Sequence, residues 1–335
     1  VVLVIGLLMA LLIPAVQSAR ESARRAECSN RLRNIGVALS SYQSALGKYP
    51  PGMIPNGTRS PNGALFAMPP AMSAQVALLP YLEQGPLYHS INILNNLPWS
   101  ATQDRDGPKP GAFNATAART VLSVFLCPSD PSRVAPGCNF RAVTGPAPNV
   151  HDVTVKLTPT HEGGQGMFPG LVAIAPREIA DGASQTIGFT ERLRGSGVDQ
   201  SFSPKRDIWN SGAQAGSDLP SGDSYLKICA SLTNSTPSFR AEAGLHWAFA
   251  SLDNTLANHV APPNWASPDC DGASTSEPLS VMNSGICSAR SQHPGGVHAL
   301  FMDGRVQFVK DSITLRVWRA LSTRAGKESL AGERY

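Results

Sequence analysis

Hydrophobic and polar positions divide the first 46 residues into two helical patterns. Residues 1–16 contain no polar side chain, and Pro14 lies near the end of this run. In residues 28–46, apolar positions recur at intervals of four and three, which places them on one face of an amphipathic helix. The positions of this stripe are Cys28, Leu32, Ile35, Leu39, Tyr42 and Leu46. Because Gly47 supplies a stop signal, we predict one helix over residues 1–46, about 70 Å long at 1.5 Å per residue.

The run at residues 1–16 is apolar on every side, so it needs lipid, a partner or other copies of itself to cover it. Its helical length is only about 24 Å, short of the roughly 30 Å hydrocarbon core of a bilayer. We therefore expect the segment to be truncated at its N-terminus. Pro14 lacks a backbone donor and is expected to disturb the helix. The candidate residues for membrane insertion and assembly are Val4, Leu8, Leu12, Pro14 and Val16.

Beyond residue 47 the pattern changes to short apolar segments between loops. The chain contains 30 Gly and 28 Pro, which favours a β-containing fold with long loops over a helical bundle. Residues 299–309 alternate around Asp303 and Gly304, which is typical of a type I′ hairpin, and residues 186–190 form another predicted strand. The segments expected to be exposed loops, facing away from the helix, are 50–72, 101–111 and 195–224.

These patterns predict an α+β fold with a long N-terminal helix packed on an antiparallel β-sheet head with extended loops. The helix is expected over residues 1–46 and the globular head over residues 47–335. The apolar stripe of the helix needs a flat apolar partner, and a sheet containing the hairpin at 299–309 supplies one.

The charge pattern gives little reason to expect a nucleic-acid partner. The net charge is +4 and charged residues make up 16% of the chain, below the usual quarter or so. Arginines are concentrated between residues 20 and 33, but Glu21 and Glu27 alternate with them. Such a mixture is typical of a solvated helix face.

The six cysteines indicate an exported protein with disulfide bonds, because none forms a C-x-x-C pair suited to a zinc knuckle. Two pairs flank short loops, so we predict the disulfides Cys127–Cys138 and Cys270–Cys287. The connectivity is not determined by the sequence. Cys28 lies on the stripe that faces the core, where it is either a buried thiol or a partner of Cys229.

No motif of a hydrolase, nucleotide-binding protein or metalloprotease is present. Glu191 has no evident acid or base partner in the sequence, and a lone carboxylate is more often structural. His293 and His298 flank a Pro-Gly-Gly turn near Asp303, where hydrogen-bonding roles are favoured over a metal site. We therefore expect a protein that is not an enzyme and has no catalytic residues.

Asp269 and Asp271 form half of a calcium-binding loop, without the remaining ligands. Calcium is the only cofactor that the sequence suggests, and these two residues are its weak candidates. Four tryptophans are candidates for a sugar site, although core packing is their commoner role. They are Trp99, Trp209, Trp247 and Trp265.

The N-terminal pattern resembles the cleaved and methylated N-terminus of type IV pilins and pseudopilins, in which an apolar half-helix with a proline precedes an amphipathic half-helix. The basic leader and the F-T-L-V-E start typical of that family are not in this chain. Later stretches resemble, in order, the pilin-like proteins whose head is the domain of unknown function 1559, once labelled a solute-binding type. These stretches are CSNRLRNIGVALSSYQSALGKYPPG (28–52), ALLPYLEQGPLYHSIN (77–92), FLCPSDP (125–131), EIADGASQTIGFTE (178–191), SQHPGGVHALFMDGRVQFVKDSI (291–313) and VWRALSTRAGKE (317–328).

The resemblance implies a structural subunit of an extracellular or cell-surface filament, either pilin-like or pseudopilin-like. Such a subunit resides in the inner membrane before assembly and then packs with many copies of itself through its N-terminal helix. Its partners would be a prepilin peptidase and the pilus assembly machinery. The alternative is a membrane-anchored periplasmic protein that binds a sugar or a peptide and does not polymerise. An enzyme is a third, less favoured interpretation.

Overall fold

The computed structural model describes residues 2–54, 71–93, 114–148, 165–197, 202–211, 222–232, 239–271, 284–328, 330 and 333. The α-helices are α1 (Val2–Leu46), α2 (Ala74–Leu78), α3 (Gly85–Ser90), α4 (Ala115–Ala118), α5 (Gly222–Ser231) and α6 (Leu315–Ala320). The strands are β1 (Met53–Ile54), β2 (Met72–Ser73), β3 (Phe140–Val143), β4 (Ile187–Glu191), β5 (Ile208–Asn210), β6 (Phe239–Arg240), β7 (Leu256–Ala257), β8 (Asp269–Asp271), β9 (Gly296–Phe301) and β10 (Val306–Lys310). Short 3₁₀ turns connect them at η1 (Leu79–Leu82), η3 (Ser123–Phe125), η4 (Pro176–Glu178) and η5 (Ala183–Gln185). The fold is α+β, as the sequence predicts.

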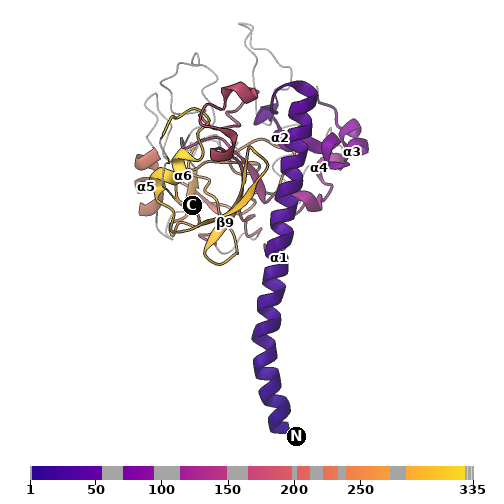
Figure 1. Cartoon of the computed structure of the whole chain (residues 1–335), viewed down its shortest axis with the longest axis vertical. Coiled ribbons are helices and arrows are strands. Elements are labelled where there is room, and N and C mark those ends of the chain that lie inside the picture. Colours follow the sequence, from indigo (N-terminus) through magenta and orange to yellow (C-terminus); the bar gives the residue numbers. More distant parts are fainter. Residues whose placement is uncertain are drawn as a thin grey trace.

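Helix α1 follows the predicted boundaries, and its N-terminal half projects away from the head while its C-terminal half lies along it (Figure 1). The helix continues through Pro14 without interruption, so the expected disturbance of the helix there is wrong at the level of secondary structure. Proline removes only one donor from the hydrogen-bond ladder. The bonds on either side are enough to carry a long helix across that position.

The head is built on a five-stranded sheet in the order β10-β9-β4-β3-β7. Its neighbours are antiparallel, except that β3 and β7 are parallel. The predicted hairpin is present, with Val306 opposite Leu300. The predicted type I′ turn is wrong: the amide of Gly304 donates to Phe301 O at 2.9 Å, and positive φ occurs at Gly304 (+87°) but not at Asp303. This is the other common arrangement for such a sequence, a type I turn followed by a left-handed glycine.

Strand β9 lies between two layers of helix, so all six of its residues are buried. Leu300 belongs to the cluster that includes the stripe of α1. Val297 and Phe301, which point to the other face, pack with Trp318 of α6 in a second cluster. The alternation of side chains along a strand therefore gives α1 one face of the sheet and α6 the other.

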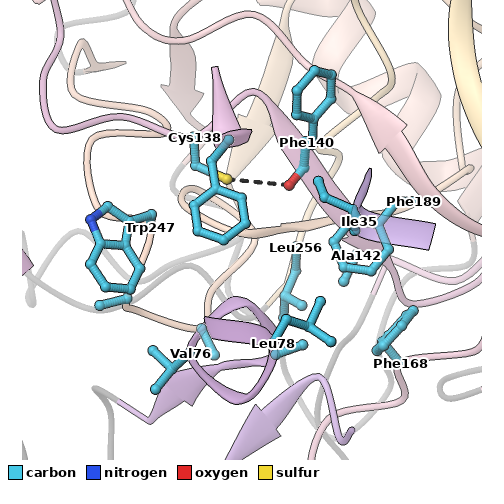
Figure 2. Close-up of a cluster of buried hydrophobic side chains, with 14 of the residues drawn as sticks. Ile35, Val76, Leu78, Cys138, Phe140, Ala142, Phe168, Phe189, Trp247 and Leu256 are labelled. Carbon is cyan, nitrogen blue, oxygen red and sulfur yellow. Dashed lines mark hydrogen bonds between the residues drawn. The ribbon is translucent and has the colours of Figure 1, made fainter. Parts of the chain in front are cut away.

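The stripe of α1 forms part of the main core, where Ile35 points toward aromatic side chains of β3 and β4 (Figure 2). Gly36 lets the helix approach the sheet closely, because a Cβ there would lie 2.8 Å from Leu300 Cδ1. Cys28, Leu32, Ile35 and Leu39 are buried and Tyr42 is partly buried, as predicted. Leu46 is 60% exposed, so the predicted stripe is covered only as far as Tyr42.

A second sheet in the order β6-β5-β8 packs with α5. Its central strand β5 lies inside the segment 195–224, and Ile208 is fully buried. The expectation that this whole segment is an exposed loop is therefore wrong. Ile208 and Trp209 favour an extended conformation, and pairing with β6 and β8 makes this stretch a strand. The predicted loop 101–111, and residues 55–70 of the loop 50–72, lie outside the described residues. The described ends of the loop 50–72 pair as β1 and β2, and Met53 and Met72 are buried, so the expectation of an exposed loop is wrong for these ends.

The cysteine pairing differs from the prediction. Disulfides join Cys28 to Cys127 and Cys229 to Cys270, whereas Cys138 and Cys287 are buried thiols. The predicted pairs Cys127–Cys138 and Cys270–Cys287 are therefore wrong. Proximity in the sequence did not decide the pairing, because the fold brings Cys28 of α1 beside Cys127, and Cys229 of α5 beside β8.

We expect alkylation in denaturant without a reductant to label two cysteines, Cys138 and Cys287, and alkylation after reduction to label all six. Intact mass measures both numbers, and peptide mapping identifies the linked peptides. In the chain-entropy model the two disulfides stabilise the fold by roughly 4 to 5 kcal/mol each. A linked peptide containing Cys127 and Cys138 would contradict this pairing.

A buried histidine predicts acid sensitivity of the head. His259 is stacked on Trp318, and burial lowers its pKa from 6.5 to about 3 despite a hydrogen-bonding contact with the Trp318 carbonyl. The unfolded chain therefore takes up a proton near pH 6.5 that the folded chain does not. The contribution of His259 to the unfolding free energy is therefore fully present above pH 6.5 and decreases as the pH drops toward 3.

At pH 5 the loss amounts to about 2 kcal/mol of unfolding free energy. Urea melts of the full chain in mild detergent at pH 7.5 and pH 5 measure it. The variant His259→Phe should reduce the difference between the two pH values by this amount. His89→Gln, a change at an exposed position, is the control and should retain the wild-type difference. An unchanged difference in His259→Phe would show that other groups cause the acid sensitivity.

Candidate functional site

The N-terminal half of α1 presents large apolar side chains to solvent. The large apolar side chains described in this half are between 45% and 86% exposed. They are Leu3, Ile5, Met9, Leu12, Ile13 and Val16. Of the predicted assembly residues, Leu12, Pro14 and Val16 are thus exposed, while the side chains of Val4 and Leu8 lie outside the described part of the structure. Fully burying one such side chain is worth roughly 1.5 to 3 kcal/mol, so this surface strongly favours an apolar partner.

Within the described residues, no helix has both the length and the hydropathy needed to cross a membrane.

Further along α1, a cluster of polar side chains and a disulfide attaches the helix to the head. We call it the junction cluster, and its members are Glu21, Cys28, Cys127, Glu191, His293 and His298. Glu191 at the end of β4 and His298 on β9 come from neighbouring antiparallel strands. The sheet therefore brings together two residues that are 107 positions apart in the chain.

Glu191 accepts two hydrogen bonds from His298. The backbone amide donates to Oε2 at 2.8 Å, and ring Nδ1 lies 2.9 Å from Oε1. His293 Nε2 approaches the same Oε1 at 3.4 Å. Glu191 thus has the partners that the sequence did not reveal, because strand pairing supplies them.

His293 also reaches the helix. Its Nδ1 lies 2.9 Å from Glu21 Oε1, and Ser129 donates to the same carboxylate at 3.1 Å. The loop before β9 holds the ring in place, since the His293 amide donates to Ser291 Oγ and this hydroxyl donates to Gly296 O. One imidazole therefore lies between a carboxylate of α1 and a carboxylate of the sheet.

The charges of these groups support one another. Burial alone would raise the pKa of Glu191, but hydrogen bonds with His293 and His298 outweigh it and lower the pKa to about 2. Burial would lower the pKa of His293, but Glu191 and Glu21 outweigh it and raise that pKa. Because both ring nitrogens face carboxylates, His293 is favoured as an imidazolium between two anions.

A covalent bond and two arginines complete the attachment. The Cys28–Cys127 disulfide crosslinks α1 to the segment after η3. Arg31 donates to the carbonyls of Ser123 and Leu126 at 2.7 and 2.9 Å. The guanidinium of Arg25 lies 3.5 Å from the ring centre of Phe308 on β10. The sequence did not single out Glu21 as part of this site, although its position seven residues before Cys28 continues the stripe of α1.

The calcium candidates have cationic partners. Asp269 forms ion pairs with Arg192 and Arg290, both at 2.9 Å. Asp271 pairs with Arg240 at 2.7 Å. In this structure guanidinium groups thus neutralise both carboxylates, and the calcium site at Asp269 and Asp271 stays a prediction.

The tryptophans proposed for a sugar site lie mostly in the core. Trp209 and Trp247 are 2% and 0% exposed, which confirms the expected packing role for these two. Trp265 is partly buried and donates to Asp269 Oδ1 at 3.1 Å. Trp99 lies outside the described residues.

Comparison with protein families assigns most of the chain. Residues 17–316 match the family described as "Protein of unknown function (DUF1559)". The chain belongs to the DUF1559 family. No curated protein and no solved structure matches it. The DUF1559 match covers the junction cluster completely, including Glu21 near its start and His298 near its end.

We expect the two carboxylates of the junction cluster to differ in their contribution to stability. Glu191→Gln removes a buried anion from two histidines and should cost about 3 kcal/mol or more of unfolding free energy. Glu21→Gln acts at a side chain that is 27% exposed, and should cost about 1 kcal/mol. Urea melts of the full chain in mild detergent at pH 7 measure both. Equal costs would show that burial does not govern the two interactions.

Proposed function

We propose that this DUF1559 protein is a structural subunit of a pilus-like or pseudopilus-like filament on the cell surface. The observation that carries the proposal is the division of α1 into a half that is buried on the head and a half whose apolar side chains are exposed. Exposed apolar side chains on a projecting helix need a partner outside the chain. The resemblance of the N-terminus to type IV pilins supports the same proposal.

In this proposal the apolar run at residues 1–16 resides in the inner membrane before assembly. During assembly it leaves the lipid and packs against the same segment of neighbouring copies, away from water. Because one copy contacts the next head to tail without closing a ring, repetition of the contact produces a helical filament. A prepilin peptidase and the pilus assembly machinery would be the partners that process and extract the subunit.

The junction cluster suits this role, because a filament subunit must hold its head in a fixed position relative to the assembling helix. A disulfide, an ion pair with His293 and the contacts of Arg31 join the two parts within about three helical turns of α1. None of these groups is assigned a catalytic role in the proposal, and neither a cofactor nor a nucleic acid takes part.

The alternative is a membrane-anchored periplasmic protein that binds a sugar or a peptide and remains a monomer. It would use the same helix as an anchor, and its head would bind the ligand. Electron microscopy of the native protein distinguishes the two: filaments support the proposal, whereas single particles support the alternative.

A charge in the exposed apolar half of α1 should prevent assembly. Leu12→Glu would place a carboxylate in the dry filament core, at a cost of several kcal/mol per subunit. We expect electron microscopy to show no filaments, while circular dichroism and urea melts show a folded head.

The matched control is Val37→Glu, which places the same charge on the same helix at a residue that is 60% exposed beside the head. This variant should form filaments like the wild type. Normal filaments from Leu12→Glu, with normal amounts of folded protein, would contradict the assembly proposal.

A further inference from the structure

The junction cluster contains the ligand types of a zinc site. Cys28, Cys127, Glu191 and His293 are all buried, and one ligand atom of each lies within 4.8 Å of the others. Zinc binds thiolate, imidazole and carboxylate ligands in a tetrahedral arrangement. The four side chains come from α1, the segment after η3, β4 and the loop before β9, so the folded chain, and no short motif, brings them together.

The distances from His293 Nε2 to two of the other ligand atoms already fit this geometry. Cys127 Sγ lies 3.6 Å from His293 Nε2, and the same nitrogen lies 3.4 Å from Glu191 Oε1. Ligands of one tetrahedral zinc ion are separated by about 3.5 Å for sulfur and nitrogen and about 3.3 Å for nitrogen and oxygen. A zinc ion bound to these three atoms would require little movement of His293 or Glu191.

Outer contacts orient the ligands in the manner of established zinc sites. Glu21 Oε1 lies 2.9 Å from His293 Nδ1, which leaves Nε2 as the nitrogen for the metal. A carboxylate on the second nitrogen fixes the ring and raises its basicity. The second oxygen of Glu191 accepts a hydrogen bond from the backbone amide of His298 at 2.8 Å. The first oxygen lies 2.9 Å from His298 Nδ1 and 3.4 Å from His293 Nε2, so His298 orients the carboxylate and would stay in contact with the ligand oxygen.

We propose that Cys28, Cys127, His293 and Glu191 bind one Zn²⁺ ion when the Cys28–Cys127 disulfide is reduced. A phosphine reductant breaks the S–S bond, leaves two thiols and is itself converted to a phosphine oxide with an oxygen atom from water. Zinc then displaces the two thiol protons and the proton on His293 Nε2. The two sulfurs separate to about 3.8 Å, the distance between thiolates on one zinc ion, by rotation of their side chains.

The disulfide and the zinc ion are mutually exclusive, because both use the two sulfurs. Either one joins α1 to the head at the same place. A chain whose cysteines are not yet oxidised would thus have its helix held by the metal. The inference is independent of filament formation, since it concerns the single folded chain.

The test compares oxidised and reduced full-length protein in mild detergent. The reduced sample is treated with tris(2-carboxyethyl)phosphine, and both samples are dialysed with Zn²⁺ and analysed for metal by mass spectrometry. We expect one zinc ion per reduced chain and none per oxidised chain. Cobalt(II) added to the reduced chain should give thiolate-to-cobalt charge-transfer bands and the intense visible bands of tetrahedral cobalt. Equal metal contents in the two states, or octahedral cobalt spectra, would overturn the proposal.

Two substitutions test the assignment of ligands without removing the disulfide. Folding of each variant is checked in the oxidised state, by circular dichroism and urea melts, before reduction. His293→Gln should reduce the zinc affinity of the reduced chain at least 100-fold, and Glu21→Gln should reduce it 10- to 100-fold through the orientation of the imidazole. The control, His89→Gln at an exposed position, should leave it unchanged. Wild-type affinity in His293→Gln would overturn the proposal.

Discussion

The burial of one stripe of α1 against the sheet determines how the rest of the molecule is arranged. Leu32, Ile35 and Leu39 cover the face of the sheet that carries Leu300 and Phe189, and Gly36 removes the one Cβ that would keep the helix away. Because the opposite face is covered by α6, the strands β9 and β4 are buried on both sides. Their polar residues must then find partners inside, and Glu191 and His298 find each other and His293. The junction cluster is thus a result of where the helix lies.

Elsewhere in the head, two buried carboxylates each lie between two arginines. Asp130 lies between Arg194 and Arg206, and Asp269 lies between Arg192 and Arg290. Such pairs add little net stability, because desolvation offsets their attraction, but removing one partner costs about 3 to 5 kcal/mol. They connect the end of β4 with the loop at Asp130 and with β8. Although charged residues are few in this chain, ion pairs inside the head are therefore needed to keep its buried carboxylates satisfied.

The sequence was sufficient where the signal is local. The spacing of the stripe and Gly47 predicted the limits of α1, and alternation around Asp303 and Gly304 predicted β9 and β10. The turn type was wrong because Asp-Gly fits both hairpin turns, and only the backbone decides between them. Most of the junction cluster could not be predicted, since Glu191 and His298 come together only because β4 pairs with β9. The packing of α1 brings Cys28 beside Cys127, which is 99 residues away in the chain. The sequence contains no signal that distinguishes this long-range pair from the other possible cysteine pairs.

The position of the Cys28–Cys127 disulfide has a mechanical consequence. The bond makes residues 29–126 part of a closed covalent loop. When a pulling force acts between the N-terminal end of α1 and the C-terminal region of the chain, the covalent path runs from Cys28 directly to Cys127. The force then passes through the disulfide, so the loop, including the part of α1 after Cys28, is not stretched. Load enters the head beside β9 and the His293 loop, so the non-covalent contacts of residues 29–46 are shielded from shear.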